Sequence, residues 1–126
     1  MSDETTTVAQ LRKQVAGFVA EREWQKYHDA KNLAMSIAIE AAELMEHFQW
    51  VRNDELPALM ADRGRRDEVL AEVADVTCFV LALANALELD LSTAVEEKLR
   101  RNAAKYPVET FRGRYFKPPR ARDEDR

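Results

Sequence analysis

The stretch NLAMSIAIEAAELMEHFQW, residues 32–50, predicts a helix that is apolar around most of its circumference and still carries acids. Its larger apolar residues recur at helical spacing, at Leu33, Ile37, Leu44 and Phe48. Glu40 and Glu43 stand three residues apart, which places both carboxylates on one face of that helix. Such a setting indicates a site rather than a solvated surface, because an apolar helix is normally buried.

A second pair of acids lies in the sequence EVADV, residues 72–76. Glu72 and Asp75 are again three residues apart, inside a helix predicted from about Arg66 to Glu88. The second half of this helix is apolar on nearly every side. One acid pair on a helix is usually solvated, but two pairs embedded in apolar helices indicate a shared role.

Two further helices are predicted outside this central pair. The first covers residues 8–27, with an apolar stripe at helical period. The last begins at Asp90 or Ser92 and stops at Pro107, because proline cannot continue a helix. The turn at 53–57 can hold one short helical turn. The fold class predicted is therefore all-α, as a bundle of four to five helices.

The chain is expected to hold one domain, at 8–111, between a disordered N-terminus at 1–7 and a polar, flexible tail at 112–126. A helix that is apolar on every side needs burial on every side, and four helices in so short a chain offer too little cover. We therefore expect homo-oligomerisation to complete the core, in a homodimer or in a homotetramer built as a dimer of dimers.

The composition excludes several classes of function. A formal charge of −4 disfavours a binder of nucleic acid polymers, which usually carries a basic surplus. The basic residues between 98 and 117 suit a small polyphosphate better than a duplex. The longest apolar stretch, 76–87, has about a dozen residues, whereas roughly 20 are needed to span a bilayer. With no secretory signal recognisable, we expect a soluble, cytoplasmic protein without membrane association.

The four acids together predict a divalent cation site. Buried carboxylates without partners are costly, so four of them facing one another require cations. Ligation by oxygen alone favours a hard ion such as Mg²⁺, with Mn²⁺ as a substitute, whereas Zn²⁺ more often recruits His or Cys. Mg²⁺ in turn suggests a phosphate-bearing substrate. The expected ligands are Glu40, Glu43, Glu72 and Asp75.

The pattern Glu40-x-x-Glu43 followed by Glu72-x-x-Asp75 resembles the signature of the all-α nucleotide pyrophosphohydrolases, the MazG-like superfamily. Further segments resemble its dCTP pyrophosphatase branch: Glu21-Arg22-Glu23-Trp24, His28, Asn32-Leu33, Phe48-Gln49-Trp50 and Lys98-x-x-x-Asn102-x-x-Lys105-Tyr106-Pro107. The resemblance covers roughly residues 8–110. It departs from the family pattern at Ile39 and Phe79, where relatives often carry Glu and Tyr, so the hydroxyl of that Tyr is absent here.

This resemblance implies an enzyme that cleaves a nucleoside triphosphate between its α and β phosphates, giving a monophosphate and pyrophosphate. The implied substrate is dCTP or a related or modified pyrimidine nucleotide, and the implied role is cleansing of the nucleotide pool. The four acids would hold Mg²⁺ against the triphosphate oxygens. We choose Glu43 as the residue that accepts a proton from the attacking water, although spacing alone does not separate a ligand from a base.

Two further groups of residues are candidates for substrate contacts. The resemblance implies phosphate binding by one face of the last helix and its end, at Lys98, Asn102, Lys105 and Tyr106. Aromatic side chains that can stack on a nucleobase are Trp24, His28, Trp50 and Phe79. A solvated basic face and ordinary core packing are the respective alternatives. His47, next to Glu46, is expected at the surface.

Three other interpretations stay open. The first is an enzyme of the same superfamily that acts on dUTP or on a damaged nucleotide. The second is a noncatalytic helical oligomerisation or binding module, whose acids pair with Arg or Lys of a partner helix, and metal binding would distinguish it from the enzyme. The third is a di-iron carboxylate bundle, for which the required Glu-x-x-His pairs are missing.

Overall fold

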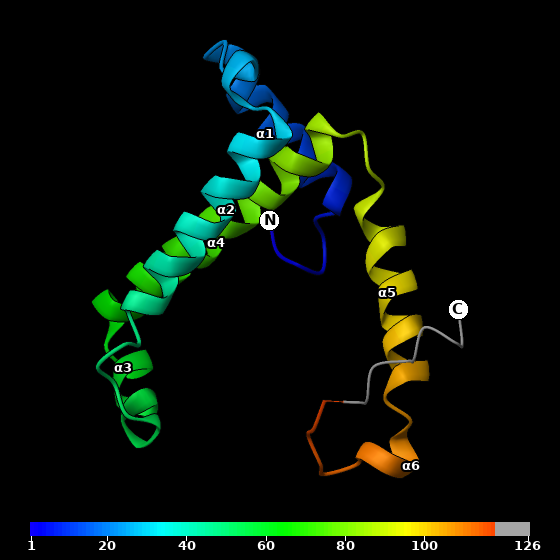
Figure 1. Cartoon of the computed structure of the whole chain (residues 1–126). Helices are drawn as coiled ribbons and strands as arrows, with labels where there is room; N and C mark the ends of the chain where they lie inside the picture. The colour runs from blue at the N-terminus through cyan, green and yellow to red at the C-terminus, as the bar shows by residue number, and fades with distance from the viewer. Residues whose placement is uncertain (118–126) are drawn as a thin grey trace. The chain divides into compact units, whose positions relative to one another are not determined.

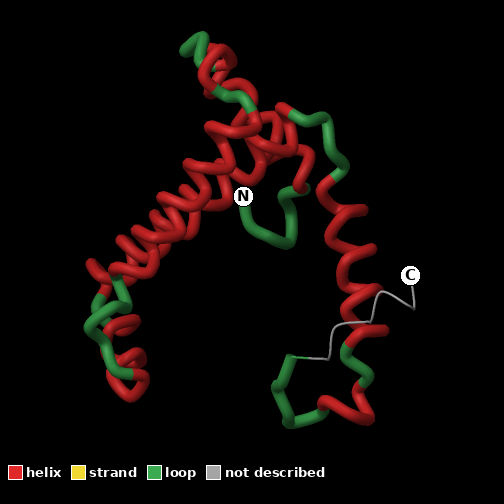
Figure 2. The backbone as a smooth tube through the Cα atoms, in the orientation of Figure 1, coloured by secondary structure: helices red, strands yellow, loops and turns green. Residues whose placement is uncertain are grey.

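The computed structural model describes residues 1–117 as helices joined by short loops, and it contains no strand in that range (Figures 1 and 2). The long helices are α1 (Val8–Glu21), α2 (Ala30–Glu46), α4 (Arg63–Ala86) and α5 (Leu91–Lys105). The short ones are η1 (Gln25–Tyr27), η2 (Asn53–Glu55), α3 (Leu56–Ala61) and α6 (Val108–Phe111). The all-α prediction is confirmed. Of the predicted tail, residues 118–126 lie outside the described range.

Side-chain caps fix where the long helices begin. The backbone N–H of Gln10 donates to Thr7 Oγ1 at 3.1 Å, and the Thr7 N–H donates to Gln10 Oε1 at 2.7 Å. Asp29, Asp62 and Asp90 cap α2, α4 and α5 by accepting from the amide three residues ahead. These bonds satisfy amides that the first helical turn leaves without partners. The aspartates start α2 and α4 earlier than hydrophobic periodicity alone predicted.

Two glutamates end helices in a backbone conformation that usually requires glycine. Glu23 follows α1 with a φ of 54°, and Glu88 follows α4 with a φ of 52°. After α1, the Trp24 N–H donates to the Val19 carbonyl at 3.0 Å. After α4, the N–H of Leu89 bonds to the carbonyl five residues earlier at 2.9 Å. Both ends therefore form the left-handed C-terminal motif of helices without its usual glycine.

The chain forms two compact units, one ending at Leu89 and the other beginning at Asp90. In the first unit α2 and α4 run antiparallel along each other, α3 lies at their connection and α1 packs on α4 (Figure 1). Arg12 on α1 ties this packing to the end of α4, because its Nε donates to Asn85 Oδ1 at 2.9 Å. The buried apolar side chains are Val19, Leu33, Leu59, Val69, Leu81, Ala82 and Ala84.

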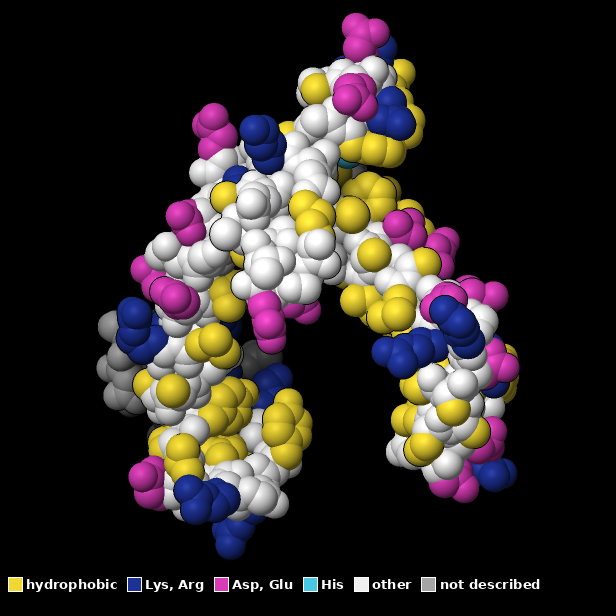
Figure 3. All heavy atoms as spheres, turned by 180° about the vertical axis from the view of Figure 1, so that it is seen from behind, with side chains coloured by type: hydrophobic (Ala, Val, Ile, Leu, Met, Phe, Trp, Pro, Cys, Tyr) yellow, Lys and Arg dark blue, Asp and Glu magenta, His cyan; other side chains and the backbone are white. Residues whose placement is uncertain are grey.

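Much of the apolar surface of α2 and α4 stays exposed, and hydrophobic side chains are visible at the surface (Figure 3). Met35 and Ile39 on α2 are each 56% exposed, and Leu70 on α4 is 48% exposed. A window of α4 has a mean hydropathy of 1.7, so the helix passes a length and composition test for a membrane span, with only 22% of that window buried. Residues 76–86 of the predicted apolar stretch 76–87 lie in this helix, and Leu87 is its C-cap. A single such helix is weak support for a membrane span, since core helices of soluble proteins pass the same test.

Candidate metal site

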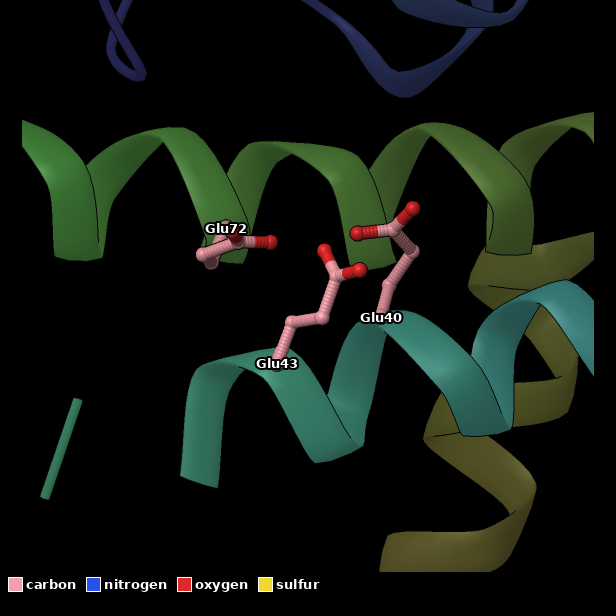
Figure 4. A group of neighbouring side chains, drawn as sticks. All are labelled: Glu40, Glu43 and Glu72. Carbon is pink, nitrogen blue, oxygen red and sulfur yellow. The ribbon is translucent and has the colours of Figure 1, made fainter. Parts of the chain in front are cut away.

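Three of the four predicted acids converge between α2 and α4. Glu40 and Glu43 point from α2 toward Glu72 on the facing helix (Figure 4). One carboxylate oxygen from each lies within 4.8 Å of the others. The spacing of three residues on α2 and the antiparallel pairing with α4 together produce this cluster, because each helix presents its acids on the shared side.

The electrostatics of the cluster show that its carboxylates interact strongly. The pKa of Glu40 is raised from an ordinary value of 4.5 to about 7. Burial is the largest cause, followed by the hydrogen bonding and charge of Glu43 and by smaller contributions from Glu72 and Asp75. Glu40 Oε2 and Glu72 Oε2 are both buried and find no hydrogen-bond partner among the described residues. Buried oxygens without donors need a proton or a cation to offset their desolvation.

Asp75 stands apart from the three clustered acids. It follows Glu72 by one helical turn on α4, its side chain is exposed, and it is not part of the group whose oxygens lie within 4.8 Å. Its negative charge nevertheless contributes to the raised pKa of Glu40. Asp75 is therefore electrostatically coupled to the cluster without joining its closest set of oxygens.

His47 lies beside the acids, so its predicted place at the open surface was wrong. Its Nε2 is 3.9 Å from Glu72 Oε1, and its side chain is only 25% exposed. The spacing Glu40, Glu43, His47 follows one helix face at intervals of three and four residues, and this signal was available in the sequence. It was missed because Glu46, the neighbour of His47, suggested a polar side.

The donor set fits a hard divalent cation. Three carboxylates supply oxygen ligands from two facing helices, which is the chemistry that Mg²⁺ and Mn²⁺ prefer. A cation between the helices would give the buried Oε2 atoms of Glu40 and Glu72 the positive partner that they lack among the described residues. Glu43, the exposed member, would complete the set from the solvent side.

The predicted base-binding residues do not share one cavity. His28 lines a cavity of about 450 Å³ between α1, η1 and α4, together with Val15, Val19 and Asn85. Trp24, Trp50 and Phe79 are not among its lining residues.

Trp24 packs edge-on against Phe18 with ring centroids 5.8 Å apart, and it stays 43% exposed. Trp50 lies beyond the end of α2 and is 86% exposed, whereas Phe79 is half-buried on α4. The first unit therefore holds an apolar cavity at His28, and Trp50 forms an exposed aromatic surface that is not part of that cavity.

The predicted phosphate-binding residues belong to the second unit. Lys98, Asn102 and Lys105 lie on α5, and Tyr106 follows it. The Tyr106 N–H donates to the Asn102 carbonyl at 2.8 Å, and Lys105 Nζ lies 5.4 Å from the Tyr106 ring centroid. The Tyr106 ring packs edge-on against Phe111 of α6 at 5.1 Å. Both lysines are exposed, so their charges are available to a ligand.

The protein is all-α. Its two central antiparallel helices share a carboxylate cluster that is a candidate site for a divalent cation. Residues 35–115 match the model of the MazG-like family, a range that contains all three clustered acids. The chain belongs to the MazG-like family.

Individual relatives agree with this assignment. The chain is 37% identical to dCTP pyrophosphatase 1 of Bos taurus and 36% identical to that of Rattus norvegicus, each over 108 residues. These matches cover 85% of this chain but only 63% of each relative's length. The crystal structure of a pyrophosphatase from Archaeoglobus fulgidus superposes with a TM-score of 0.75 at 39% identity, covering 85% of this chain and 98% of that one.

Proposed function

We propose that this chain is a Mg²⁺-dependent nucleoside triphosphate pyrophosphohydrolase that releases pyrophosphate and leaves a nucleoside monophosphate. The observation that carries the proposal is the cluster of Glu40, Glu43 and Glu72, in which two buried oxygens have no hydrogen-bond partner among residues 1–117. The names of the relatives, dCTP pyrophosphatase 1 and pyrophosphatase, support the same reaction. A carboxylate cluster suited to Mg²⁺ is the usual protein component of phosphate-transfer sites.

In this mechanism the carboxylates on α2 and α4 would hold a divalent cation at the place where the triphosphate binds. Bound Mg²⁺ would offset the charge of the triphosphate and the charge that develops at the α phosphate. Glu40 and Glu72 supply the buried oxygens, and Asp75, one turn from Glu72, supplies the fourth carboxylate. Because these acids sit on two packed helices, their spacing is fixed before the substrate arrives.

Glu43 is the proposed general base. It is the exposed member of the cluster, so a water molecule can reach its carboxylate, whereas Glu40 and Glu72 are half-buried. The water oxygen forms a bond to the α phosphorus as the bond from that phosphorus to the bridging oxygen breaks. Pyrophosphate leaves with the electron pair of that bond, and Glu43 accepts the water proton.

The proposed substrate is dCTP or a related or modified pyrimidine nucleotide. The two exposed lysines, Lys98 and Lys105, together with Asn102 and Tyr106, are proposed to contact the phosphates. The nucleobase is proposed to contact aromatic side chains, namely those of Trp24, His28, Trp50 and Phe79. The names of the relatives support a pyrimidine, whereas Phe79 lacks a hydroxyl with which to select one.

We further propose that the functional form is a homodimer or a dimer of dimers. Large apolar side chains such as Met35, Ile39 and Leu70 are about half exposed or more in the single chain. Burying apolar surface stabilises by about 25 cal/mol per Å². A second copy covering α2 and α4 would bury this surface, and α4 would then be a core helix of a soluble protein. We propose that this protein is cytoplasmic and that it binds neither membranes nor nucleic acid polymers.

A product assay tests the proposed reaction. The purified chain is incubated with each canonical deoxy- and ribonucleoside triphosphate, with Mg²⁺, with Mn²⁺ and with EDTA, and pyrophosphate and single phosphate are quantified separately. Metal-dependent release of pyrophosphate with a preference for dCTP is expected. Release of single phosphate would refute the bond assignment. Inactivity on this panel and on 5-modified dCTP, in a chain that still binds Mg²⁺, would favour the noncatalytic binding module.

A further inference from the structure

His47 occupies a defined place at the end of the acidic face of α2. The helix ends at Glu46, and His47 is its C-cap, with φ of −62° and ψ of −24°. It follows Glu43 by four residues and Glu40 by seven, which keeps the imidazole on the side that faces α4. The side chain is thus carried to the cluster by helical geometry rather than by a flexible loop.

The two oxygens of Glu72 have different surroundings. Oε1 lies 3.9 Å from His47 Nε2, and the two side chains are only 20% and 25% exposed. Oε2 is buried and has no hydrogen-bond partner among the described residues. One oxygen therefore faces the imidazole while the other is left for a different partner.

We propose that His47 is a positioning residue for Glu72, holding Oε1 so that Oε2 is presented to the divalent cation. This inference rests on the metal site of the proposed function. A glutamate side chain rotates about three bonds, so it loses conformational entropy when it binds a cation. An imidazole that restrains one carboxylate oxygen before the cation binds reduces that loss. Partners of this kind, which contact a ligand rather than the ion, typically change metal affinity by about 10- to 100-fold.

The experiment measures metal binding without substrate. Mn²⁺ is titrated into the full chain and free ion is followed by electron paramagnetic resonance, with Mg²⁺ competition. His47→Ala is expected to weaken Mn²⁺ binding about tenfold, and His47→Gln, which keeps a donor, is expected to recover part of the loss. Glu46→Gln, an exposed neighbour on the same turn, is the matched control and should bind as wild type does.

Several results would overturn the proposal. Equal Mn²⁺ affinity in wild type and His47→Ala, with wild type binding normally, would refute the role of His47 and leave the metal site intact. A nitrogen coupling in the pulsed spectrum of bound Mn²⁺ that disappears in His47→Ala would make the histidine a direct ligand instead. Failure of wild type to bind Mn²⁺ would refute the metal site and, with it, the positioning role.

A purely structural role for His47 is distinguished by thermal unfolding. If the contact with Glu72 served only to join α2 and α4, His47→Ala would lower the melting temperature of the metal-free chain and leave Mn²⁺ affinity unchanged. The positioning role predicts the converse, a lower affinity in a chain whose metal-free stability changes little, because a single polar contact at 3.9 Å contributes only modestly to folding.

Discussion

Glu40 on α2 and Glu72 on α4 each bury one carboxylate oxygen, Oε2, for which the described residues provide no hydrogen-bond partner. Two such atoms, one on each of two antiparallel helices, oppose folding when no cation is present. The helices hold them there because the flanking residues are apolar and pack against each other. The cluster is therefore arranged for binding at the expense of stability.

Metal addition should stabilise the fold. A cation that binds only the folded chain raises the free energy of unfolding by about 2.7 kcal/mol at a concentration 100 times its dissociation constant. We expect Mg²⁺ to raise the melting temperature measured by calorimetry, and EDTA to reverse the rise. Glu72→Gln, which removes one ligand charge, should abolish most of the Mg²⁺ effect. An equal rise in melting temperature with a potassium salt, free of divalent cations and at matched ionic strength, would contradict a specific site.

Stability of the metal-free chain should depend on pH through Glu40. Its pKa is raised from 4.5 to about 7 in the folded chain, so between these values the folded chain keeps a proton that the unfolded chain has released. Folding stability from this group is therefore highest below pH 4.5, falls as pH rises toward 7, and is constant above it. Unfolding in EDTA between pH 4.5 and 8 should show this fall in wild type and a smaller one in Glu40→Gln.

Replacing Glu43, the exposed acid of the cluster, should lower the turnover rate strongly while the oligomer still forms. Glu43→Gln keeps the size of the side chain but cannot accept the water proton, and a lost general base typically costs about 10²- to 10⁴-fold in rate. Turnover at saturating Mg²⁺ is the measurement, with Glu46→Gln as the exposed control. Near-normal turnover of purified Glu43→Gln would exclude it as the base.

A charge placed on the exposed apolar face of α2 should weaken self-association. Met35 is 56% exposed in the single chain, so Met35→Glu is tolerated by the isolated fold but would bury a carboxylate in the proposed interface. Sedimentation velocity at micromolar concentration should show a shift toward monomer. Asn53→Asp adds the same charge at an exposed position in η2 and should leave the assembly unchanged. A wild-type monomer would contradict the proposed oligomer outright.

Sequence patterns were sufficient for the helices and for the grouping of acids along each one, because both depend on local periodicity. Glu40 and Glu43 share a face by spacing alone, yet the approach of Glu72 depends on how α2 and α4 pair, which no local rule contains. Asp75 illustrates the limit, since its spacing from Glu72 resembles that of the other pair while its side chain stays exposed.

The same limit applies to His47 and to the predicted base-binding residues. His47 was assigned from its polar neighbour, although its place relative to Glu72 depends on the end of α2 and on the partner helix. Aromatic residue type suggested a common role for Trp24, Trp50 and Phe79, but the cavity at His28 is lined mostly by Ala and Val of α1 and α4, together with Gln25 and Asn85. Residue type alone does not reveal which side chains share a space.

Replacing the glutamates with positive φ that follow α1 and α4, Glu23 and Glu88, by glycine should raise the stability of the fold. Residues with a Cβ are disfavoured at positive φ by roughly 1 kcal/mol, so Glu88→Gly, at a φ of 52°, should raise the free energy of unfolding by about that amount. Glu97→Gly in the interior of α5 is the matched control, and it should lower stability by about 1 kcal/mol because glycine disfavours helix. Urea unfolding of the two variants measures both changes. A loss of stability in Glu88→Gly would mean that the Glu88 side chain makes a contact worth more than the strain it carries.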